Sequence, residues 1–227
     1  MKTYVYTKAN KKTVSLVNFV HVPRTAGTAF TSCLFDSSNH KRNTRQNILL
    51  NTLDKNHIRI SKYVHSTAME YPPETYKIAF IRHPFDRFLS AFAYLKEGAA
   101  HNPIYAGGQK HMQKHMNKYK KPGDLFNASP PDRNWILSDI HFRPMVDFLC
   151  DDKNKLAVHY IGTSDTIEQD VIHISRILNI KQLKMEKSNE SKLKYKLTET
   201  DKKFLKEHYK DDFKLYNKVM KDKLKKA

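Results

Sequence analysis

The sequence of 227 residues lacks the long apolar segments that membrane and secreted proteins carry. No run approaches the roughly 18–20 apolar residues that a transmembrane helix needs, and residues 1–12 have no apolar core of the kind found in signal peptides. Only two cysteines occur, Cys33 and Cys150, and they are too far apart to form a C-x-x-C motif. We therefore expect a soluble, non-secreted protein whose thiols are reduced and structural.

Acidic residues are also scarce in this chain. Asp and Glu together number 23 against 41 Lys and Arg, which gives a formal net charge of +18. The excess is uneven, since residues 181–227 contain 16 lysines and 8 acids, and residues 98–123 contain no acid at all. A field of this sign favours an anionic partner, whether nucleic acid, anionic lipid or a polyanionic substrate, but it does not choose among them.

The sequence does contain enough apolar material for one sizeable domain. Apolar residues make up 39% of the chain, with 12 Phe and 12 Tyr, and the length suits a single core. Amphipathic patterns predict several helices, one of them at 44–53. Capping boxes formed by Asp165 with Glu168 and by Thr198 with Asp201 predict the starts of two others. Stretches rich in apolar and β-branched residues predict strands at 14–22, 58–64, 76–81 and 156–161, and the one at 76–81 is the clearest. We predict an α/β protein with a central parallel sheet flanked by helices: one domain over residues 1–227, with a basic insert at about 98–131 and a C-terminal helix at about 198–225.

The stretch at residues 18–30, NFVHVPRTAGTAF, ends a strand, passes through a turn of small residues and enters a helix. Such a turn aims backbone N–H groups and a helix N-terminus at an anion. Arg24 adds a permanent positive charge, and the threonines add hydroxyl donors. The pattern predicts a phosphate or sulfate site, with an ordinary strand–loop–helix corner as the alternative.

A second anion site is predicted where the strand at 76–81 ends. Arg82 follows the strand directly, and Pro84 suits the first position of a helix. At 100° per residue, Arg87 and Ser90 fall opposite the buried stripe of that helix. Either Arg82 and Ser90 converge on an anion, or this side of the helix is a solvated polar face.

Several histidines have both a functional and a structural interpretation. His65 lies at the tip of the second predicted strand, where a general base would sit beside the anion loop; a partly buried histidine bonded to backbone is the alternative. His141 and Arg143 either face the cleft or tie down a loop. His111 and His115 form an H-x-x-x-H pair, but no third ligand is evident and the neighbouring lysines disfavour a dication, so we predict no metal site. A basic insert over a substrate cleft fits this segment better.

Two segments together resemble a known enzyme family. HVPRTAGTAF at 21–30 is similar to the 5′-phosphosulfate loop of sulfotransferases that use 3′-phosphoadenosine-5′-phosphosulfate (PAPS), and FIRHPFDRFLSAF at 80–92 is similar to their 3′-phosphate motif. Three later segments resemble landmarks of the carbohydrate, Golgi-type (sulfotransferase family 2-like) branch: HFRPM at 141–145, YIGTSDTIEQD at 160–170 and KSNES at 187–191. The resemblance implies a P-loop-kinase-like sulfotransferase fold, PAPS as the donor substrate, 3′-phosphoadenosine-5′-phosphate as its product, and no requirement for a metal.

The resemblance also implies a role for each matching residue. The 3′-phosphate would be bound by Arg82 and Ser90, and Lys187 and Ser188 would also contact the donor. The 5′-phosphosulfate would be bound by the loop and the helix N-terminus, formed by Arg24, Thr25, Ala26, Gly27, Thr28 and Ala29.

The catalytic roles implied by the resemblance fall on His65 and Arg24. His65 would take the proton of the acceptor hydroxyl during in-line transfer, and Arg24 would help to neutralise the bridging oxygen as the sulfuryl group leaves. The family usually has lysine at this position, and arginine supplies the charge without the same compact point donor. His141 and Arg143 would contact the acceptor.

Two other functions compete with a carbohydrate sulfotransferase. A P-loop-like nucleotide or small-molecule kinase would need G-x-x-x-x-G-K-[ST], whereas PRTAGT has one glycine and no lysine. A non-catalytic polyanion-binding protein fits the charge, but it gives Arg24, Arg82 and Ser90 no reason for their arrangement, and nucleic-acid recognition motifs are missing. We expect a glycan acceptor, for which the lysine excess favours an acidic saccharide, and either a cytoplasmic enzyme or the soluble catalytic domain of a Golgi-type protein. The modified hydroxyl and the oligomeric state stay open.

Overall fold

The computed structural model describes residues 15–36, 51–53, 58–61, 66–71, 73, 75–98, 106–178 and 193–225. The chain forms two compact units, the first from Met1–Ile81 and Met145–Ser188 and the second from Arg82–Pro144 and Asn189–Ala227. Each unit is therefore built from two separate stretches of the chain. The predicted single domain over residues 1–227 stays a prediction.

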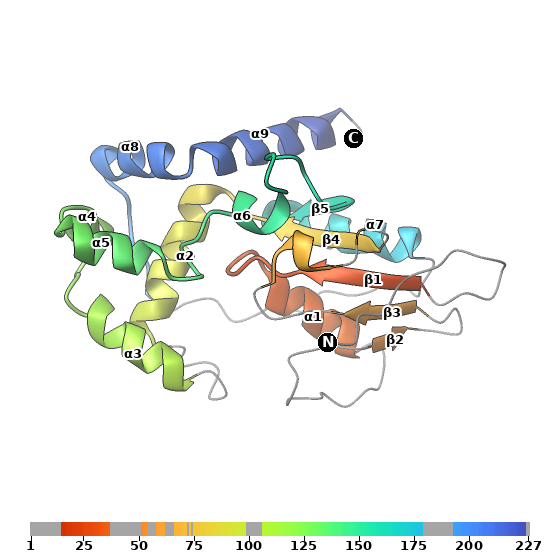
Figure 1. Cartoon of the computed structure of the whole chain (residues 1–227), viewed down its shortest axis with the longest axis horizontal. Coiled ribbons are helices and arrows are strands. Elements are labelled where there is room, and N and C mark those ends of the chain that lie inside the picture. Colours follow the sequence, from red (N-terminus) through yellow and green to blue (C-terminus); the bar gives the residue numbers. More distant parts are fainter. Residues whose placement is uncertain are drawn as a thin grey trace. The chain divides into compact units, whose positions relative to one another are not determined.

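The first unit contains a five-stranded sheet with the order β2-β3-β1-β4-β5 (Figure 1). Its parallel strands are β3, β1, β4 and β5, and β2 pairs antiparallel with β3. The strand bounds are β1 Ser15–Val20, β2 Asn51–Leu53, β3 Ile58–Ser61, β4 Tyr76–Ile81 and β5 Tyr160–Thr163. The predicted α/β class with a central parallel sheet is confirmed.

Helices α1 (Gly27–Asp36) and α7 (Ile167–Ile177) cover one face of this sheet. Alternate residues of a strand point to the same face of the sheet. The residues of β1 and β4 that point toward α1 and α7 pack with these two helices in one buried cluster. Within it, the Phe30 ring of α1 lies 4.9 Å from Phe19 of β1 and 5.0 Å from Phe80 of β4. Since β4 is apolar from Ile78 to Ile81, both of its faces suit burial. The cluster fixes the place where β1 ends and α1 begins.

The unit also holds the short elements η1 (Ala68–Glu70), α6 (Val146–Leu149) and η3 (Ser164–Thr166). Two sequence predictions are wrong in this unit. The helix predicted at 44–53 is contradicted at Asn51–Leu53, which pairs with β3 as an edge strand; a short apolar pattern does not distinguish helix from strand, and 44–50 lie outside the described residues. A capping box at Asp165 and Glu168 was expected to open α7, but Thr166 is the N-cap residue and no side-chain cap bond forms there.

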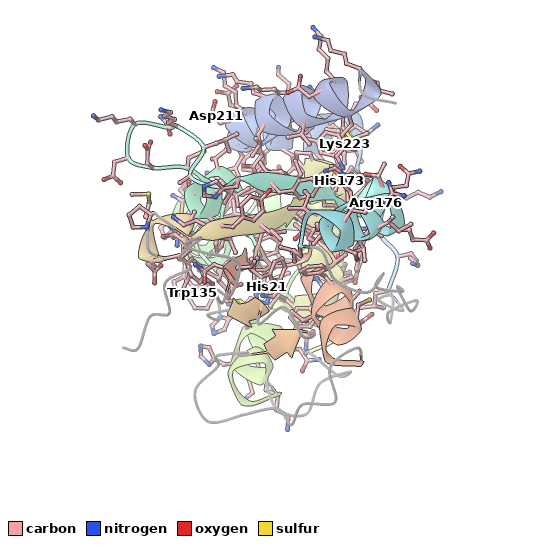
Figure 2. The ribbon with its side chains drawn as sticks, turned by 90° about the vertical axis from the view of Figure 1, so that its right-hand side faces the viewer. His21, Trp135, His173, Arg176, Asp211 and Lys223 are labelled. Carbon is pink, nitrogen blue, oxygen red and sulfur yellow. The ribbon has the colours of Figure 1, made fainter. Side chains whose placement is uncertain are left out.

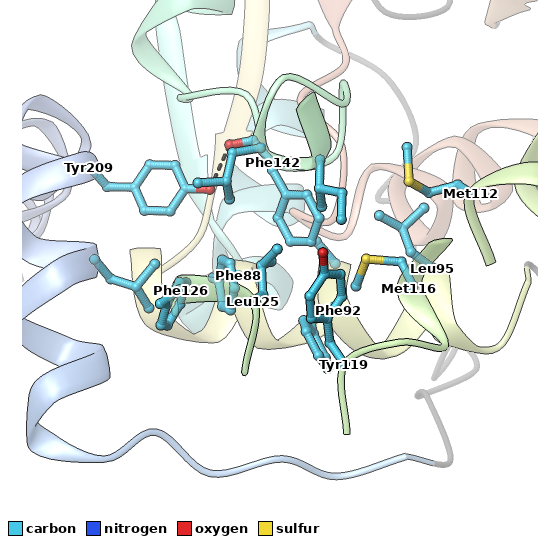
Figure 3. Close-up of a cluster of buried hydrophobic side chains, with 14 residues drawn as sticks. Phe88, Phe92, Leu95, Met112, Met116, Tyr119, Leu125, Phe126, Phe142 and Tyr209 are labelled. Atoms are coloured by element: carbon cyan, nitrogen blue, oxygen red, sulfur yellow. Dashed lines mark hydrogen bonds between the residues drawn. The ribbon is translucent and has the colours of Figure 1, made fainter. Parts of the chain in front are cut away.

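The second unit is helical. It contains α2 (Pro84–Lys96), α3 (Ala106–Met116), α4 (Pro122–Phe126), α5 (Pro130–Leu137), α8 (Glu199–His208) and α9 (Lys210–Leu224). Its core joins apolar side chains of α2, α3, α4, α5 and α8 with Phe142 and Tyr209 (Figure 3). The basic insert predicted at 98–131 contains α3, α4 and the start of α5.

Tyr209 divides the predicted C-terminal helix. Its φ of −107° and ψ of 29° leave the helical range, so α8 ends before it and α9 begins after it. The side chain is fully buried, and its hydroxyl donates a hydrogen bond of 2.6 Å to the carbonyl oxygen of Phe142 (Figure 3). The capping box predicted from Thr198 and Asp201 is confirmed at the start of α8.

Candidate active site

The loop between β1 and α1 has an unusual backbone. Arg24 and Ala26 both have a φ of +67°, in the left-handed region that non-glycine residues rarely adopt. Each such residue costs roughly 1–2 kcal/mol because its Cβ approaches the following carbonyl oxygen. Non-glycine residues held in this region cluster at ligand-binding sites, where the surrounding structure maintains them. The loop is therefore held in a shape that its own residues disfavour.

Local hydrogen bonds hold that shape. Thr25 is fully buried, and its hydroxyl donates to the carbonyl oxygen of Val22 at 2.9 Å. The N–H of Phe30 donates to the carbonyl oxygen of Ala26 at 3.1 Å, which begins the hydrogen bonding of α1. Thr28 is exposed. The hydroxyl proton of Thr25 is thus engaged within the loop, and Thr28 carries the exposed hydroxyl of the predicted pair.

Gly27 is required by a close approach of His21. A Cβ at residue 27 would lie 2.2 Å from Cδ2 of His21 and 3.2 Å from Cζ of Phe19. The His21 ring, labelled in Figure 2, stands 5.8 Å from the Phe19 ring. The single glycine of PRTAGT therefore allows the first turn of α1 to pack against the end of β1.

The N-terminus of α1 carries no acidic residue in its first turn. The partial positive charge of a helix N-terminus is therefore not opposed by a carboxylate on the same turn. Ala29 is buried at 6% exposure, whereas Arg24 and Ala26 are half-buried. This combination of a half-buried arginine, left-handed loop residues and a helix N-terminus suits an anionic group.

The strand order places this loop at the switch point of the sheet. From β1 the chain continues to β3 on one side of β1, and it then returns to β4 on the other side. In open α/β sheets, ligands bind outside the carboxyl ends of the strands at such a point. Since β3, β1 and β4 are parallel neighbours, their carboxyl ends share one edge of the sheet.

Arg82 is the first residue after the carboxyl end of β4, and α2 begins at Pro84 with His83 as its N-cap. The His83 ring contacts Phe213 and Tyr216 of α9 edge-on, with ring centroids 5.6 and 5.1 Å apart. Within the second unit, α9 thus fixes the turn that carries Arg82. Arg82 itself is half-buried.

The side of α2 opposite its apolar stripe is not a simple solvated face. Arg87 is 2% exposed, and Ser90 is half-buried. Burial raises the pKa of the fully buried Tyr209, while the charge of Arg87 lowers it and that of Asp212 raises it. Sequence reasoning did not assign Arg87 a role, although the R-x-P-x-x-R-x-x-S pattern contains it. Its burial depends on α8 and α9, which pack on α2.

His141 is held by Asp139. The Oδ1 atom of Asp139 accepts from the backbone N–H of His141 at 2.9 Å and lies 2.7 Å from Nδ1 of its ring. His141 is 6% exposed, and the centroid of its ring lies 5.0 Å from that of the Tyr94 ring. Arg143 is half-buried, and its backbone N–H donates a hydrogen bond to the carbonyl oxygen of Asp139. These contacts account for a loop-fixing role of His141; acceptor binding by His141 and Arg143 stays a prediction.

A buried carboxylate that sequence reasoning missed stabilises the end of β5. Asp170 is 4% exposed and accepts hydrogen bonds from the Tyr160 hydroxyl, the Thr163 N–H and the Thr166 hydroxyl, at 2.6, 2.8 and 2.8 Å. Burial and the bond to Asp170 raise the pKa of Tyr160. The threonine and aspartate spacing in YIGTSDTIEQD was the signal that could have revealed this network.

Three predicted site residues, His65, Lys187 and Ser188, lie outside the described residues. Among the residues that the structure does describe, no group of three or more His, Cys, Asp or Glu side chains could hold a metal ion. Within the same part of the chain, no helix is long and apolar enough to cross a bilayer.

The fold and the loop define an α/β protein in which a left-handed loop and a helix N-terminus, an arrangement that suits an anionic group, lie at the switch point of a parallel sheet. A family model described as "Sulfotransferase family" matches residues 11–219. The chain therefore belongs to the sulfotransferase family and is an enzyme of sulfuryl transfer. A search of the curated proteins found no significant match.

Proposed function

We propose that this enzyme transfers the sulfuryl group of PAPS to a hydroxyl of a carbohydrate acceptor. The observation that carries the proposal is the position of three sequence features after three neighbouring parallel strands. In the chain, His65 follows β3, Arg24 and the left-handed loop follow β1, and Arg82 follows β4. Because parallel strands end at the same edge of a sheet, this order favours one site for donor and base.

The donor carries two separated anionic groups, the 5′-phosphosulfate and the 3′-phosphate, which explains why the chain has two separated cations, Arg24 and Arg82. The loop at 24–28 and the N-terminus of α1 bind the 5′-phosphosulfate, where Arg24 stabilises the negative charge that develops on the bridging oxygen. Arg82 and Ser90 bind the 3′-phosphate, with a charge-assisted hydrogen bond from the guanidinium. Lys187 and Ser188 complete the donor contacts.

The transfer needs one base and no redox step. The acceptor oxygen forms a new S–O bond as the bond between sulfur and the bridging oxygen breaks, and the bisphosphate leaves. His65 takes the proton of the acceptor hydroxyl, so that a neutral hydroxyl attacks without a free alkoxide. His141 and Arg143 contact the acceptor in this scheme.

Thermal unfolding with 3′-phosphoadenosine-5′-phosphate, ATP or AMP tests donor binding. A ligand at about 100 times its Kd adds about 2.7 kcal/mol to the stability, which for a chain of this size raises Tm by about 5–11 °C. We expect this shift with the bisphosphate. A shift with ATP and none with the bisphosphate would identify a nucleotide kinase instead, and a shift with neither would remove the donor assignment.

Two variants separate binding from chemistry. His65→Ala should keep the bisphosphate shift and lose transfer by about 10²–10⁴-fold, the usual contribution of a general base. Arg82→Ala should weaken bisphosphate binding by about 10–150-fold, because a hydrogen bond to a charged group contributes about 1.5–3 kcal/mol.

His173→Ala and Arg176→Ala are matched controls, since both exposed side chains lie on α7 (Figure 2). Neither should change binding or turnover. Near-normal turnover in His65→Ala would exclude His65 as the base while leaving the donor site intact. A screen of sugar acceptors with a sulfur-labelled donor then identifies the modified hydroxyl.

A further inference from the structure

The only tryptophan of the chain is exposed. Trp135 lies on α5 with 45% of its surface accessible, next to the buried Ile136 and Leu137 (Figure 2). It is the only aromatic residue among the large exposed apolar residues of the described chain. A single exposed apolar side chain is ordinary, so its surroundings decide whether it has a function.

Two imidazole rings of α3 lie against Trp135. The His115 ring centroid is 4.6 Å from that of Trp135, and the His111 ring meets the indole edge-on at 6.3 Å. The two imidazoles are 4.9 Å apart. These three rings, here called the Trp135 platform, contact one another, and the indole stays accessible.

The platform borders a row of lysines. Met112 and Met116 point from α3 into the core (Figure 3), and at 100° per residue His111 and His115 lie beside that buried stripe. Lys114 follows on the outer side, 60° from His111 by the same count. Lys118 lies two residues past the end of α3, and both lysines are exposed. Residues 106–121 contain five lysines and no acid.

The acids that follow are engaged within their own segments. Asp124 accepts hydrogen bonds from backbone N–H groups at the start of α4. Asp132 is bonded to Ser129 at the start of α5, and Asp139 to His141. Each of these acids has a local structural partner but keeps its charge. Residues 106–139 contain five lysines and one arginine against these three acids, so the segment keeps a net positive charge beside the accessible indole.

We propose that the Trp135 platform binds a sugar ring of an acidic glycan, with the carboxylate or sulfate of the glycan facing Lys114 and Lys118. The C–H face of a pyranose is apolar and flat enough to stack on an indole, and its anionic substituent complements the ammonium groups. This proposal rests on the proposed carbohydrate acceptor. It adds that the acceptor is acidic and that it binds to the Trp135 platform.

A nucleic-acid strand would also stack on an aromatic ring and pair with lysines. Proteins that bind single strands usually offer several aromatic rings to successive bases, whereas the described chain exposes one. The observations therefore favour a glycan, and an oligonucleotide serves as the competing probe.

Because Trp135 is the only tryptophan, its fluorescence reports on the platform alone. The probe is a tetrasaccharide of alternating uronic acid and N-acetylhexosamine; the comparisons are a neutral N-acetylglucosamine tetrasaccharide and an oligothymidylate. We expect a saturable change with the acidic tetrasaccharide and a much weaker one with the neutral sugar. An equal response to the neutral sugar, or a stronger one to the oligothymidylate, would overturn the proposal.

Variants test the same surface by anisotropy of a fluorescently labelled tetrasaccharide. Trp135→Ala should weaken binding by about tenfold, equivalent to about 1.4 kcal/mol. The double change Lys114→Gln with Lys118→Gln should weaken it similarly, whereas Lys153→Gln with Lys155→Gln removes the same charge from exposed residues of the first unit and should not. Equal losses in both lysine pairs would show binding to net charge only and would overturn the platform.

The bisphosphate thermal shift separates this inference from the proposed function. It should be unchanged in Trp135→Ala, which also shows that the variant is folded. A normal bisphosphate shift with no glycan response would overturn the platform and leave the donor site standing. Glycan binding at Trp135 without any bisphosphate shift would instead remove the donor assignment.

Discussion

The left-handed backbone conformation of the β1–α1 loop can be tested by making the same substitution, alanine to glycine, at two positions. Ala26→Gly and Ala29→Gly each remove a single methyl group, and the two sites are three residues apart. Ala26 has a φ of +67°, whereas Ala29 lies within α1 and is buried. The backbone conformation therefore predicts opposite consequences for the free energy of unfolding.

At Ala26, glycine removes a conformational penalty of roughly 1–2 kcal/mol. It also makes the unfolded chain more flexible, which costs about 0.4–1 kcal/mol. The net effect lies between about zero and 1.6 kcal/mol of added stability. At Ala29, glycine loses up to about 1 kcal/mol of helix propensity and about 0.8 kcal/mol of apolar burial, so we expect a loss of about 1–2 kcal/mol.

Thermal and urea unfolding followed by circular dichroism measure the difference. Since 1 kcal/mol shifts Tm by about 2–4 °C in a chain of this size, Ala29→Gly should lower Tm by about 2–8 °C and Ala26→Gly should not lower it. Equal losses of stability in the two variants would refute the argument that the loop is held in a left-handed conformation.

Three further changes probe the surrounding structure. Tyr209→Phe should cost about 1–3 kcal/mol, because it leaves the buried carbonyl of Phe142 without its donor; a change below about 0.5 kcal/mol in urea unfolding would mean that water replaces the hydroxyl. Gly162→Ala places a methyl 2.4 Å from a buried ring of β4 and should cost about 1–3 kcal/mol by the same measurement, whereas an unchanged urea midpoint would show that the ring moves aside freely. The Nδ1 atom of His159 accepts a hydrogen bond from the backbone N–H of Lys77. Burial, together with the charge of the Lys77 side chain, holds the pKa of His159 below its ordinary value of 6.5. The unfolded chain therefore binds a proton more readily, so stability should fall as pH drops below 6.5, and His159→Gln should flatten that slope in a pH series of Tm values; an unaltered slope would assign the effect to other groups.

Local sequence was sufficient for several elements because their signals are local. The apolar run Ile78–Ile81 of β4 and the proline that starts α2 fix a strand and a helix boundary with little help from the rest of the chain. The turn of small residues between β1 and α1 and the capping box of α8 are of the same kind. The weak pattern at 44–53 fitted either a helix or a strand, and pairing with β3 decided for a strand at Asn51–Leu53.

Contacts between distant segments decided the remainder. Helical periodicity gives the side of α2 on which Arg87 lies, but it does not say that α8 and α9 cover that side and bury it. Likewise, the sequence placed His111 and His115 in a basic insert with no metal site, and only the packing of α5 in the tertiary structure brings Trp135 against both rings.

The sequence by itself determined that a turn of small residues with Arg24 joins a buried strand to a helix, and that a second cation, Arg82, follows another strand. It determined these features because turns, caps and apolar runs act over a few neighbouring residues. Only the tertiary structure decided that β1 lies between β3 and β4, which makes the loop a switch point. It also decided that Arg24 and Ala26 adopt left-handed backbone conformations. Strand order and strained dihedrals depend on packing between segments far apart in the chain, and no local pattern encodes them.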